Sequence, residues 1–547
     1  MNYLAWNRPP SLPALARAVA QYPKPLYLVV CLPDNALPVF RPSETPSAQE
    51  TALSQAIRSK LGCIQFNAAN ALYDILPGVH LWLMPSETAR RLGEHFPQPV
   101  QWQTEAVPQL PPPNVKPWFK PPERRTATRA IVIGAGIAGA ATARALAQHG
   151  LPVTVLEAAE PANAASGNRQ GLLYAKISPH NTEQTELLLC GYGHTRRLLE
   201  TLLPAQENWG GSGVLHLNHN DEETRRNLAL SAQTHHAHLY RPVCAETASQ
   251  LAGIPLTQSA LYWPQGVWLN PPALVNTLLD HPLIELHTRT PALAAEYRNG
   301  VWQVATAAQT FRGSHIVYCM GAHSPLAAAA DVSALPYRLI RGQTDLATAT
   351  PYSAALRCAL SAAGYISPAW QGVHCFGATF IQHDTGSEWR ASDTEANRLT
   401  LRELDAELAG NLFSDGLNPN PDRPSETRSN SPAQPLQGHA ALRCDSPDHL
   451  PLVGALGDIY AMQQAYAKLA LDKNYRIHTP CPYLPGAYIN TAHGSRGLAT
   501  APVCAAAVTA DILGLPNPLS QRLRNALSPN RTVIRAIIRG RPLLAEA

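Results

Sequence analysis

The stretch AIVIGAGIAG, residues 130–139, decides how most of this chain folds. Its first four residues form a short apolar run typical of a buried parallel strand. The glycines that follow have the spacing G-x-G-x-x-G. Gly134 permits a tight turn, Gly136 permits close approach of a pyrophosphate to the backbone, and Gly139 permits a helix to pack on the strand. The stretch therefore predicts the start of a dinucleotide-binding βαβ unit.

The residues after the glycines supply the context that this motif needs. Ala140–Gly150 is an Ala-rich helix former that ends at a glycine, and Val153–Leu156 has the composition of a second strand. Phosphates are expected at the N-terminus of the helix, formed by Gly136, Ile137 and Ala138, because free N–H groups and the helix dipole favour anions there.

A carboxylate at the end of the second strand narrows the choice of cofactor. Glu157 lies 18 residues beyond Gly139, where a carboxylate accepts hydrogen bonds from ribose hydroxyls and repels a 2′-phosphate. FAD or NAD is therefore expected, and NADP is not.

Composition excludes several classes of protein. The chain has 547 residues, 45% of them apolar, and a net charge of +4, which argues against disorder throughout. The run Ile131–Ala143 falls short of the roughly 20 residues of a membrane span, and Met1–Pro10 lacks the features of a secretory signal. Ten cysteines without a CxxC pair and 20 histidines without HExxH or Cys/His spacing predict no metal site. A reduced, cytoplasmic setting fits best.

Prolines divide the chain. Seven of the fifteen residues from Pro108 to Pro122 are proline, so residues 108–128 are expected to be a stiff, extended linker. Residues 1–107 before it are predicted to form a small α/β unit without an evident site. Its expected strands and helices are Leu26–Leu32, Val79–Met84, Thr51–Leu61 and Glu87–Leu92. A second low-complexity stretch, Asn418–Gln437, is expected to be a surface loop.

A polar loop after Glu157 favours FAD over NAD as the cofactor. The run Ser166-Gly167-Asn168-Arg169-Gln170-Gly171 is unusual in NAD dehydrogenases, whereas FAD-dependent amine oxidases carry such a loop after the second strand. Further segments occur in a fixed order: YWPQGVW (262–268), GYISP (364–368), LRCDSPDHLPLVG (442–454), GSRGL (494–498) and LSPNR (527–531). Over about 410 residues, from Ala130 to Arg541, the chain resembles the oxidoreductase part of the bifunctional tRNA 5-methylaminomethyl-2-thiouridine biosynthesis protein, the MnmC family.

The resemblance implies an architecture. We expect an α/β plus α+β fold in which a Rossmann-type FAD-binding domain is joined to a mixed, mainly antiparallel substrate-binding sheet. Residues 129–545 would form this oxidoreductase, and the overlapping residues 516–547 at its end would form a basic C-terminal helix. The FAD-binding segments would be about 129–220, 310–330 and 440–515, and the substrate-binding segments about 221–309 and 331–439.

The resemblance also implies an activity. The family's oxidase removes the carboxymethyl group of 5-carboxymethylaminomethyl-2-thiouridine at tRNA position 34 and leaves 5-aminomethyl-2-thiouridine. FAD and tRNA are thus the expected cofactor and partner, with no DNA and no membrane. The family has a methyltransferase of over two hundred residues upstream, but residues 1–107 show no cofactor loop. We therefore expect no methyl transfer by this chain and a separate methyltransferase acting on the product.

The resemblance assigns the FAD-binding residues. The loop from Ser166 to Gly171 would hold the ribityl and pyrophosphate region, and Ile316–Tyr318 leading to Gly321 resembles the strand and turn that close the site. A helix N-terminus is suited to stabilising the charge of reduced flavin. One segment precedes the apolar helix Ala501–Leu513 and suits this role. It consists of Gly494, Ser495, Arg496, Gly497 and Leu498.

The substrate carboxylate needs a fixed cation, and a bidentate arginine suits it best. Arg443 is the candidate because its motif resembles the strand with the carboxylate-binding arginine of glycine-oxidase-like enzymes; a structural ion pair is the alternative. Arg341 is the reserve. Tyr365 would line the pocket or belong to the core, and His493 would be a pocket residue or a satisfied core histidine.

The C-terminal arginines suggest an RNA contact. Arg531, Arg535 and Arg539 recur every four residues and would share one helix face, opposite Val533, Ile534, Ile537 and Ile538. That face would bind tRNA phosphates or simply be solvated. Three functions stay open from the sequence: a tRNA-modifying oxidase, a small-molecule amine oxidase for glycine- or sarcosine-like substrates, and a non-catalytic FAD- or tRNA-binding protein.

Overall fold

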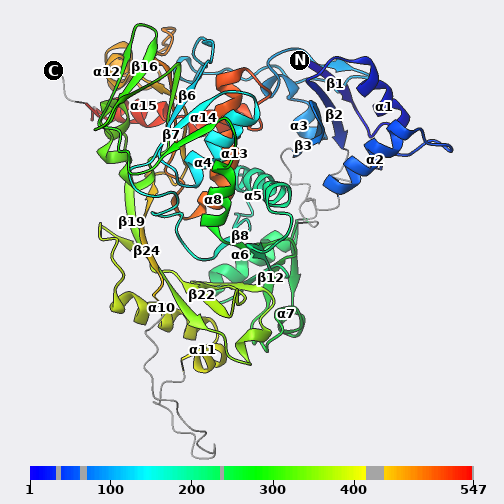
Figure 1. The fold of residues 1–547 in the computed structure, drawn as a ribbon, viewed down its shortest axis with the longest axis vertical. Helices are drawn as coiled ribbons and strands as arrows, with labels where there is room; N and C mark the ends of the chain where they lie inside the picture. Colours follow the sequence, from blue (N-terminus) through cyan, green and yellow to red (C-terminus); the bar gives the residue numbers. More distant parts are fainter. Residues whose placement is uncertain (33–38, 62–70, 234–238, 414–436, 542, 545–547) are drawn as a thin grey trace, which may run out of the picture.

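The computed structural model describes residues 1–32, 39–61, 71–233, 239–413, 437–541 and 543–544. A Rossmann-type sheet and its helices form the upper part of the molecule in Figure 1, a large mixed sheet forms the lower part, and a small N-terminal unit lies to one side. Except for Gln437, the predicted loop Asn418–Gln437 lies outside the described residues.

The upper sheet has six strands built from distant parts of the chain. β6, the strand of the quoted stretch, pairs in parallel with the strand that follows the next helix and with a strand 185 residues later. Only the last strand is antiparallel. In spatial order the strands are β14 (Ile284–His287), β7 (Val153–Leu156), β6 (Ala130–Ile133), β18 (His315–Tyr318), β26 (Tyr483–Thr491) and β25 (Leu452–Gly457). The predicted βαβ unit is confirmed.

Both faces of this sheet are covered, which explains why β6 is apolar throughout. On one face lie α4 (Ile137–Gln148), α5 (Glu183–Leu202), α8 (Pro271–Leu279) and α13 (Gly497–Leu513). On the other lie a three-stranded meander and two helices: β15 (Ala294–Arg298), β16 (Val301–Ala305), β17 (Thr310–Gly313), α12 (Ile459–Ala465) and α15 (Asn530–Ile538).

The longest apolar helix belongs to this core. The stretch Gly494–Leu513 is long and apolar enough to cross a membrane by length and composition, but 67% of its 18-residue apolar window is buried inside the protein. α13 packs against α4 and α5. It is therefore a core helix between two others.

The lower sheet has nine strands and is mixed. Only one pair, β10 with β20, is parallel, and the other pairs are antiparallel. Its strands are β11 (Arg241–Val243), β12 (Ala260–Trp263), β10 (Val214–Leu217), β20 (Ala359–Ser361), β21 (Tyr365–Ile366), β22 (Val373–Gly377), β19 (Arg338–Thr348), β23 (Ile381–Gln382) and β24 (His439–Asp445). The helices packed around it are α6 (Asp221–Ser231), α7 (Ala245–Ala252), α10 (Ala391–Leu404) and α11 (Ala406–Leu412). The expected fold class is confirmed.

The predicted segment boundaries need three corrections. β10, placed with the FAD-binding segments, belongs to the nine-stranded sheet, as does β24. β14, placed with the substrate-binding segments, lies at the edge of the six-stranded sheet. A further small sheet joins β8 (Gly171–Leu173), β13 (Val267–Leu269) and β9 (Trp209–Gly210) across the boundary. The chain crosses between the two sheets more often than the motifs indicate.

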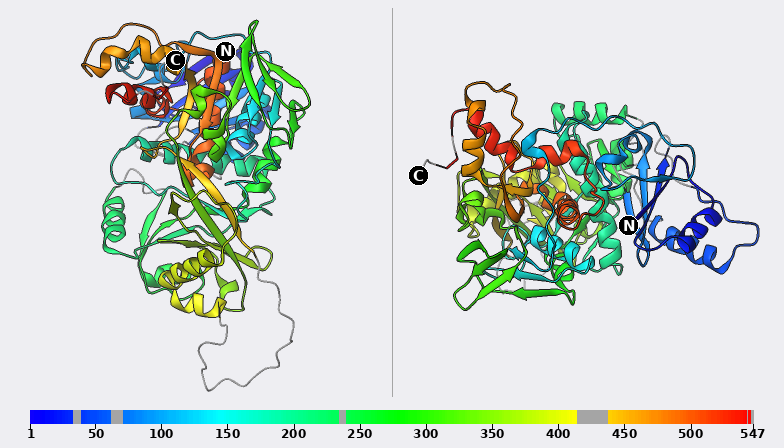
Figure 2. Two further views of the ribbon diagram at one scale, coloured as in Figure 1. Left: turned by 90° about the vertical axis from the view of Figure 1, so that its left-hand side faces the viewer. Right: turned by 90° about the horizontal axis from the view of Figure 1, so that it is seen from above.

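The N-terminal unit is a five-stranded sheet with apolar clusters on both faces. Figure 2 shows it beside the main body. Its elements are β1 (Asn2–Trp6), α1 (Leu12–Gln21), β2 (Leu26–Leu32), α2 (Ala48–Leu61), β3 (Ala71–Leu76), β4 (Val79–Pro85), α3 (Ser86–Ala89), the 3-10 turn η2 (Leu92–Glu94) and β5 (Gln101–Trp102). The four predicted elements are found, and β1, α1, β3 and β5 are additional.

Contacts near His95 dock this unit on the main body. The backbone N–H of Asn517 donates to His95 O at 2.8 Å, and His95 Nδ1 lies 2.9 Å from Asn517 O. Burial lowers the pKa of His95 to about 4, so the imidazole is neutral at pH 7. The linker that follows is extended apart from a 3-10 turn, η3 (Pro117–Phe119).

The C-terminal region is two helices and not one. α14 (Gln521–Leu527) and α15 (Asn530–Ile538) are separated at Pro529. The residue before a proline is disfavoured in helical conformation, so Ser528 ends the first helix.

Candidate active site

The glycine turn after β6 is shaped by close backbone contacts. Gly134 has φ +101°, and a side chain there would lie 2.6 Å from Cys319 O. A side chain at Gly139 would overlap the carbonyl oxygen of Gly134. The first and third glycines are therefore required by the packing of β6, α4 and the turn after β18.

Two helix N-termini meet beside this turn. Gly136 is the N-cap of α4, and the N–H of Ile137 donates to Ser166 Oγ at 3.0 Å. At the start of α13, a side chain on Gly497 would lie 3.6 Å from Ile137 Cγ2. Because both helix dipoles present their positive ends here, the position favours an anion.

Glu157 is fixed at the end of β7. Its Oε2 accepts the N–H of Ala135 at 2.7 Å, and its Oε1 accepts the N–H of Ala159 at 2.9 Å. The carboxylate is thus held beside the glycine turn with lone pairs left for other donors, which suits the predicted ribose contact.

The loop Ser166–Gly171 runs along the edge of the lower sheet. Asn168 Nδ2 donates to Tyr365 Oη at 2.9 Å, and Tyr365 Oη donates to Gln170 O at 2.9 Å. Arg169 stacks on Trp370, with its guanidinium carbon 4.5 Å from the ring centroid. Burial raises the pKa of Tyr365 well above its usual value, so the phenol stays protonated. The loop is therefore fixed to β21 and the turn after it.

Distant segments converge on this loop. A side chain on Gly171 would lie 2.5 Å from Leu498 Cδ1, and one on Gly494 would lie 3.2 Å from Asp445 Cγ. The N–H of Gly321 donates to Thr491 Oγ1 at 3.1 Å. Residues 130–175, 317–324 and 490–513, which lie within the predicted FAD-binding segments, therefore come together.

Arg443 lies on β24 and faces this convergence. β24 pairs with β19 so that Arg443 is opposite Ile340, and the guanidinium lies over Gly342, where any side chain would overlap it. Its Nη1 donates to Thr379 O at 3.0 Å. Burial lowers the pKa of Arg443, and the nearby Tyr365 raises it. Within the described residues no carboxylate pairs with Arg443, so the alternative of a structural ion pair finds no support.

Arg341, the reserve candidate, lies on the opposite face of the ladder. It is fully buried beneath α10, 2.9 Å from Asp393 Oδ2, and donates to the carbonyl oxygens of Gly386 and Glu388. Both terminal nitrogens of its guanidinium already have partners inside the protein. Arg341 is therefore a structural residue, and the reserve assignment is wrong.

Comparison with known proteins identifies the arrangement. Residues 129–511 match the family model "FAD dependent oxidoreductase". The chain belongs to the FAD dependent oxidoreductase family. FAD is accordingly its cofactor.

Individual proteins are similar to this chain over most of its sequence. The chain is 40% identical over 430 residues to the tRNA 5-methylaminomethyl-2-thiouridine biosynthesis bifunctional protein MnmC of Pseudomonas syringae pv. tomato, covering 78% of this chain but only 63% of the relative. The protein of the same name from Chromobacterium violaceum is 37% identical over 516 residues, covering 91% of this chain and 74% of the relative. The second match necessarily includes part of residues 1–107.

Solved structures share the fold of the main body. Glycine oxidase from Geobacillus kaustophilus superposes with a TM-score of 0.57 at 16% identity, covering 74% of this chain and 99% of that one. Iminodiacetate oxidase from Chelativorans sp. BNC1 gives 0.54 at 17% identity, covering 73% and 99%. At this identity the likeness shows the fold alone.

The residues of the site fit the cofactor of a FAD dependent oxidoreductase. Among the predicted cofactor-binding residues, three buried side-chain atoms lack a hydrogen-bond partner in the described structure: Arg169 Nε, Gln170 Oε1 and Arg496 Nη1. Burial lowers the pKa of Arg496, as expected for a buried cation. Since buried polar groups are rarely left unpaired, unpartnered donors and an unpartnered acceptor on the loop Ser166–Gly171 and at the start of α13 are consistent with a polar ligand between these segments.

His493 is a satisfied histidine. Its ring nitrogens lie 2.9 Å from Thr500 Oγ1 and 2.9 Å from Asn490 Oδ1, at the start of α13. Burial lowers its pKa to about 3. Of the two interpretations left open by the sequence, the structure favours the core histidine.

The C-terminal arginines do not share one exposed face. Arg531 is 4% exposed, pairs with Asp448 at 2.9 Å and donates to the carbonyl oxygens of Leu450 and Pro451. The assignment of Arg531 to tRNA is therefore wrong, because its guanidinium is buried and fully used. Arg535 also pairs with Asp448 but is half-exposed, and Arg539 is exposed.

Several site residues escaped the sequence analysis. Thr344 Oγ1 donates to Asn168 Oδ1 at 3.0 Å, and Cys375 Sγ lies 3.3 Å from the same oxygen. Gly342 provides the space for Arg443. Counting alternate residues along β19 would have placed Gly342 and Thr344 on one face, but only the register with β24 shows that this face carries Arg443.

Proposed function

We propose that this chain is an FAD-dependent oxidase that removes the carboxymethyl group from 5-carboxymethylaminomethyl-2-thiouridine at tRNA position 34, giving 5-aminomethyl-2-thiouridine. The observation that carries the proposal is Arg443, a half-buried cation that has no carboxylate partner among the described residues and lies beside the loop Ser166–Gly171. Identity of 40% with proteins named for biosynthesis of this tRNA base supports the choice of substrate.

We assign the cofactor contacts as follows. Glu157 accepts from the adenosine ribose, and the N-terminus of α4, with Gly134, Gly136, Ile137, Ala138 and Gly139, receives the pyrophosphate. The remaining contacts are assigned to the loop and to the two other convergent segments: Ser166, Gly167, Asn168, Arg169, Gln170, Gly171, Gly321, Gly494, Ser495, Arg496, Gly497 and Leu498.

The chain's own residues position the substrate. Arg443 binds the carboxylate of the carboxymethyl group through charge-assisted hydrogen bonds. Tyr365 stays neutral and holds Asn168 and Gln170 in place. FAD supplies the two-electron acceptor for oxidation of the CH–NH unit when it is bound. Water then hydrolyses the C=N bond of the oxidised substrate, and the two-carbon acid leaves as glyoxylate.

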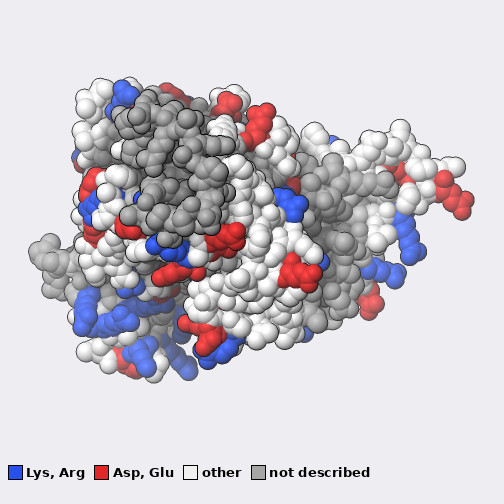
Figure 3. Space-filling model, turned by 90° about the horizontal axis from the view of Figure 1, so that it is seen from below, with Lys and Arg blue, Asp and Glu red and all other residues white. Residues whose placement is uncertain are grey.

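The partner is tRNA, and the setting is the cytoplasm, without membrane or DNA. In the view from below, Lys and Arg side chains gather along one edge of the molecule, while carboxylates are scattered over the rest of that face (Figure 3). We assign tRNA contacts to Arg535 and Arg539, which are accessible. We assign no second activity to residues 1–107, and we propose that a separate methyltransferase acts on the product.

The test is direct. The purified holoprotein is mixed with tRNA carrying 5-carboxymethylaminomethyl-2-thiouridine, and the nucleosides are separated by mass after digestion. We expect the aminomethyl base and glyoxylate in equal amounts. Unchanged tRNA, with flavin that does not bleach under anaerobic conditions, would contradict the proposal and leave only FAD or tRNA binding.

A second candidate is a small-molecule amine oxidase, favoured by the superposition with glycine oxidase and iminodiacetate oxidase. These two names describe substrates with a carboxylate one carbon from an amine, which Arg443 also suits. Bleaching by free glycine, sarcosine or iminodiacetate faster than by modified tRNA would favour this candidate.

A further inference from the structure

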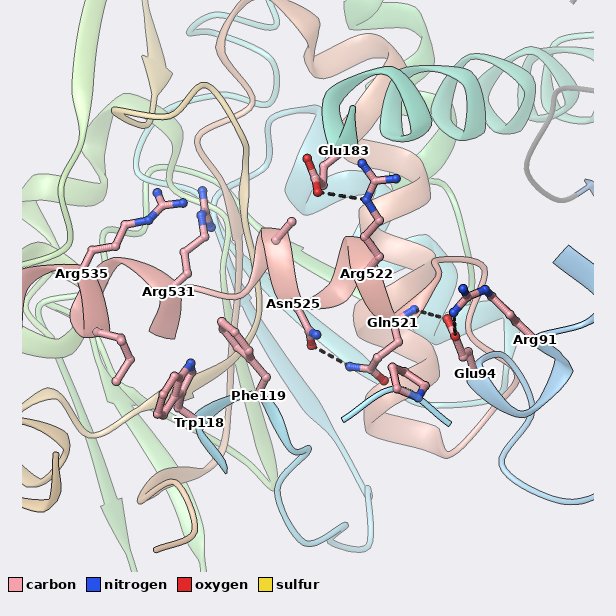
Figure 4. A pocket seen from close by; sticks show the side chains of 13 residues that line it. Arg91, Glu94, Trp118, Phe119, Glu183, Gln521, Arg522, Asn525, Arg531 and Arg535 are labelled. Carbon is pink, nitrogen blue, oxygen red and sulfur yellow. Dashed lines mark hydrogen bonds and ion pairs between the residues drawn. The ribbon is translucent and has the colours of Figure 1, made fainter. Parts of the chain in front are cut away.

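A groove outside the FAD site lies where three parts of the chain meet. It has a volume of about 520 Å³ and is bounded by the end of the N-terminal unit, the linker, α5, α14 and α15 (Figure 4). Guanidinium groups, aromatic rings and side-chain amides line it together. None of the residues assigned to oxidation contributes to it.

The cations of the groove keep donors free for a ligand. The side chains of Arg91, Arg522 and Arg535 are 46%, 41% and 52% exposed. Arg91 and Arg535 each use a single guanidinium nitrogen on a carboxylate among the described residues, that of Glu94 or Asp448. The planar fork of arginine can therefore donate its other N–H groups to phosphate oxygens.

The linker supplies the aromatic surface. Trp118 and Phe119 line the groove with ring centroids 6.0 Å apart, and both side chains are half-buried. Trp118 packs edge-on against the buried ring of Tyr466 at 5.7 Å, which fixes it in place. Lys116 and Lys120, both exposed, flank this pair in the sequence.

A side-chain amide pair completes the lining. Gln521 Nε2 donates to Asn525 Oδ1 at 2.7 Å along α14. Figure 4 shows Phe119 next to Asn525. In this view Trp118 lies on one side of the helices, and the arginines lie on the other: Arg522, Arg531 and Arg535. Amide groups next to rings are able to bond base edges.

One loop connects the groove with the candidate active site. Asp448, which pairs with Arg531 and Arg535, is five residues after Arg443. Five residues span at most about 18 Å, so the backbone of Asp448 lies within about that distance of Arg443. A short RNA strand with one base at Arg443 is long enough to reach the groove.

We propose that this groove binds a second nucleotide of the substrate RNA, a few positions from the base that is oxidised. Its base stacks on Trp118 or Phe119, its phosphate is bound by Arg535, and Arg91 at the other end of the groove attracts the continuing strand. The inference rests on the proposed function for the identity of the RNA. Stacking on an aromatic ring beside arginines is the mode by which proteins bind single-stranded nucleic acid, whereas an acidic peptide would need the cations but not the rings.

Binding of a fluorescent anticodon stem-loop RNA to the full-length holoprotein tests the proposal. In fluorescence anisotropy we expect the double variant Trp118→Ala/Arg535→Gln to raise the Kd at least tenfold and to reduce its dependence on salt. Arg402→Gln on α10, an exposed arginine of the lower unit, is the matched control and should change the Kd less than twofold. Flavin absorbance shows which variants are folded.

Crosslinking makes the test independent of Trp118 packing. RNA substituted with 4-thiouridine should crosslink to the peptide that contains Trp118 and Phe119, and Arg91→Gln should weaken binding by itself. A Kd unchanged within twofold in all groove variants, with crosslinks only elsewhere, overturns the proposal. Polyglutamate represents an acidic peptide as a competitor. If it displaces the RNA equally well from the wild type and from Trp118→Ala, the proposal is also overturned. If the oxidase proposal fails instead, modified tRNA leaves the flavin unbleached while the crosslink persists.

Discussion

The two faces of the β19–β24 ladder carry arginines with opposite surroundings. Arg341 is fully buried under α10, paired with Asp393 and bonded to two carbonyl oxygens. Arg443, one register position away on the neighbouring strand, bonds one carbonyl oxygen and faces Tyr365 and the FAD-binding loop. Arg443 is also less deeply buried than Arg341. The comparison teaches that residue type alone does not separate a structural cation from one available to a substrate, whereas partners and exposure do.

The largest effect is expected at Arg443. Arg443→Ala should lower kcat/KM by about 10³-fold, because the substrate carboxylate loses its charge-assisted partner while flavin binding is retained. Nucleoside analysis and flavin absorbance measure the two quantities. Arg443→Lys keeps the charge without the fork and should recover part of the loss. A fall of less than tenfold in the alanine variant would remove Arg443 from the site.

Arg341 should show the reverse pattern. Arg341→Met leaves Asp393 buried without its cation, so the free energy of unfolding should fall by about 3–5 kcal/mol in urea titrations. The double variant Arg341→Met/Asp393→Leu should regain much of the stability. Stability equal to the wild type in the single variant would contradict the structural role.

Gly342 offers a smaller and more selective change. A methyl group there overlaps the guanidinium of Arg443, so Gly342→Ala should lower kcat/KM about 10- to 100-fold by displacing that side chain. In an Arg443→Ala background the same substitution should add little, since the group it displaces is absent. Additive losses in this double-mutant cycle would show that Gly342 acts by another route.

Tyr365 should give the smallest effect. Tyr365→Phe removes the hydroxyl between Asn168 and Gln170 and should cost about 1 kcal/mol, or about fivefold in kcat/KM. The pH profile should be unchanged, because the phenol is neutral throughout the working range. A new pH dependence in the variant would mean that Tyr365 takes part in proton transfer.

Sequence alone could predict the βαβ unit, because its signals lie within thirty consecutive residues. Ala130–Ile133, the glycines, Ala140–Gly150 and Val153–Leu156 need only local patterns. Arg443 was found through its motif, but the choice against Arg341 depends on strand register, which local patterns do not contain.

The failure at Arg531 has the same cause. Its spacing with Arg535 and Arg539 predicts a shared helix face, and helical geometry does bring i and i+4 residues together. The partner that buries Arg531 is Asp448, 83 residues earlier, together with carbonyl oxygens of the following loop. Spacing along one helix cannot reveal such a contact.

The pairing of β18 with both β6 and β26 bears on the order of events during synthesis. The N-terminal sheet needs only the first 102 residues, whereas the six-stranded sheet is incomplete until residue 491 has left the ribosome. Domains fold from the N-terminus as the chain emerges, and contacts distant in sequence form late. The growing polypeptide thus carries a finished N-terminal unit long before it can capture its yellow cofactor, and flavin uptake marks the completion of the six-stranded sheet.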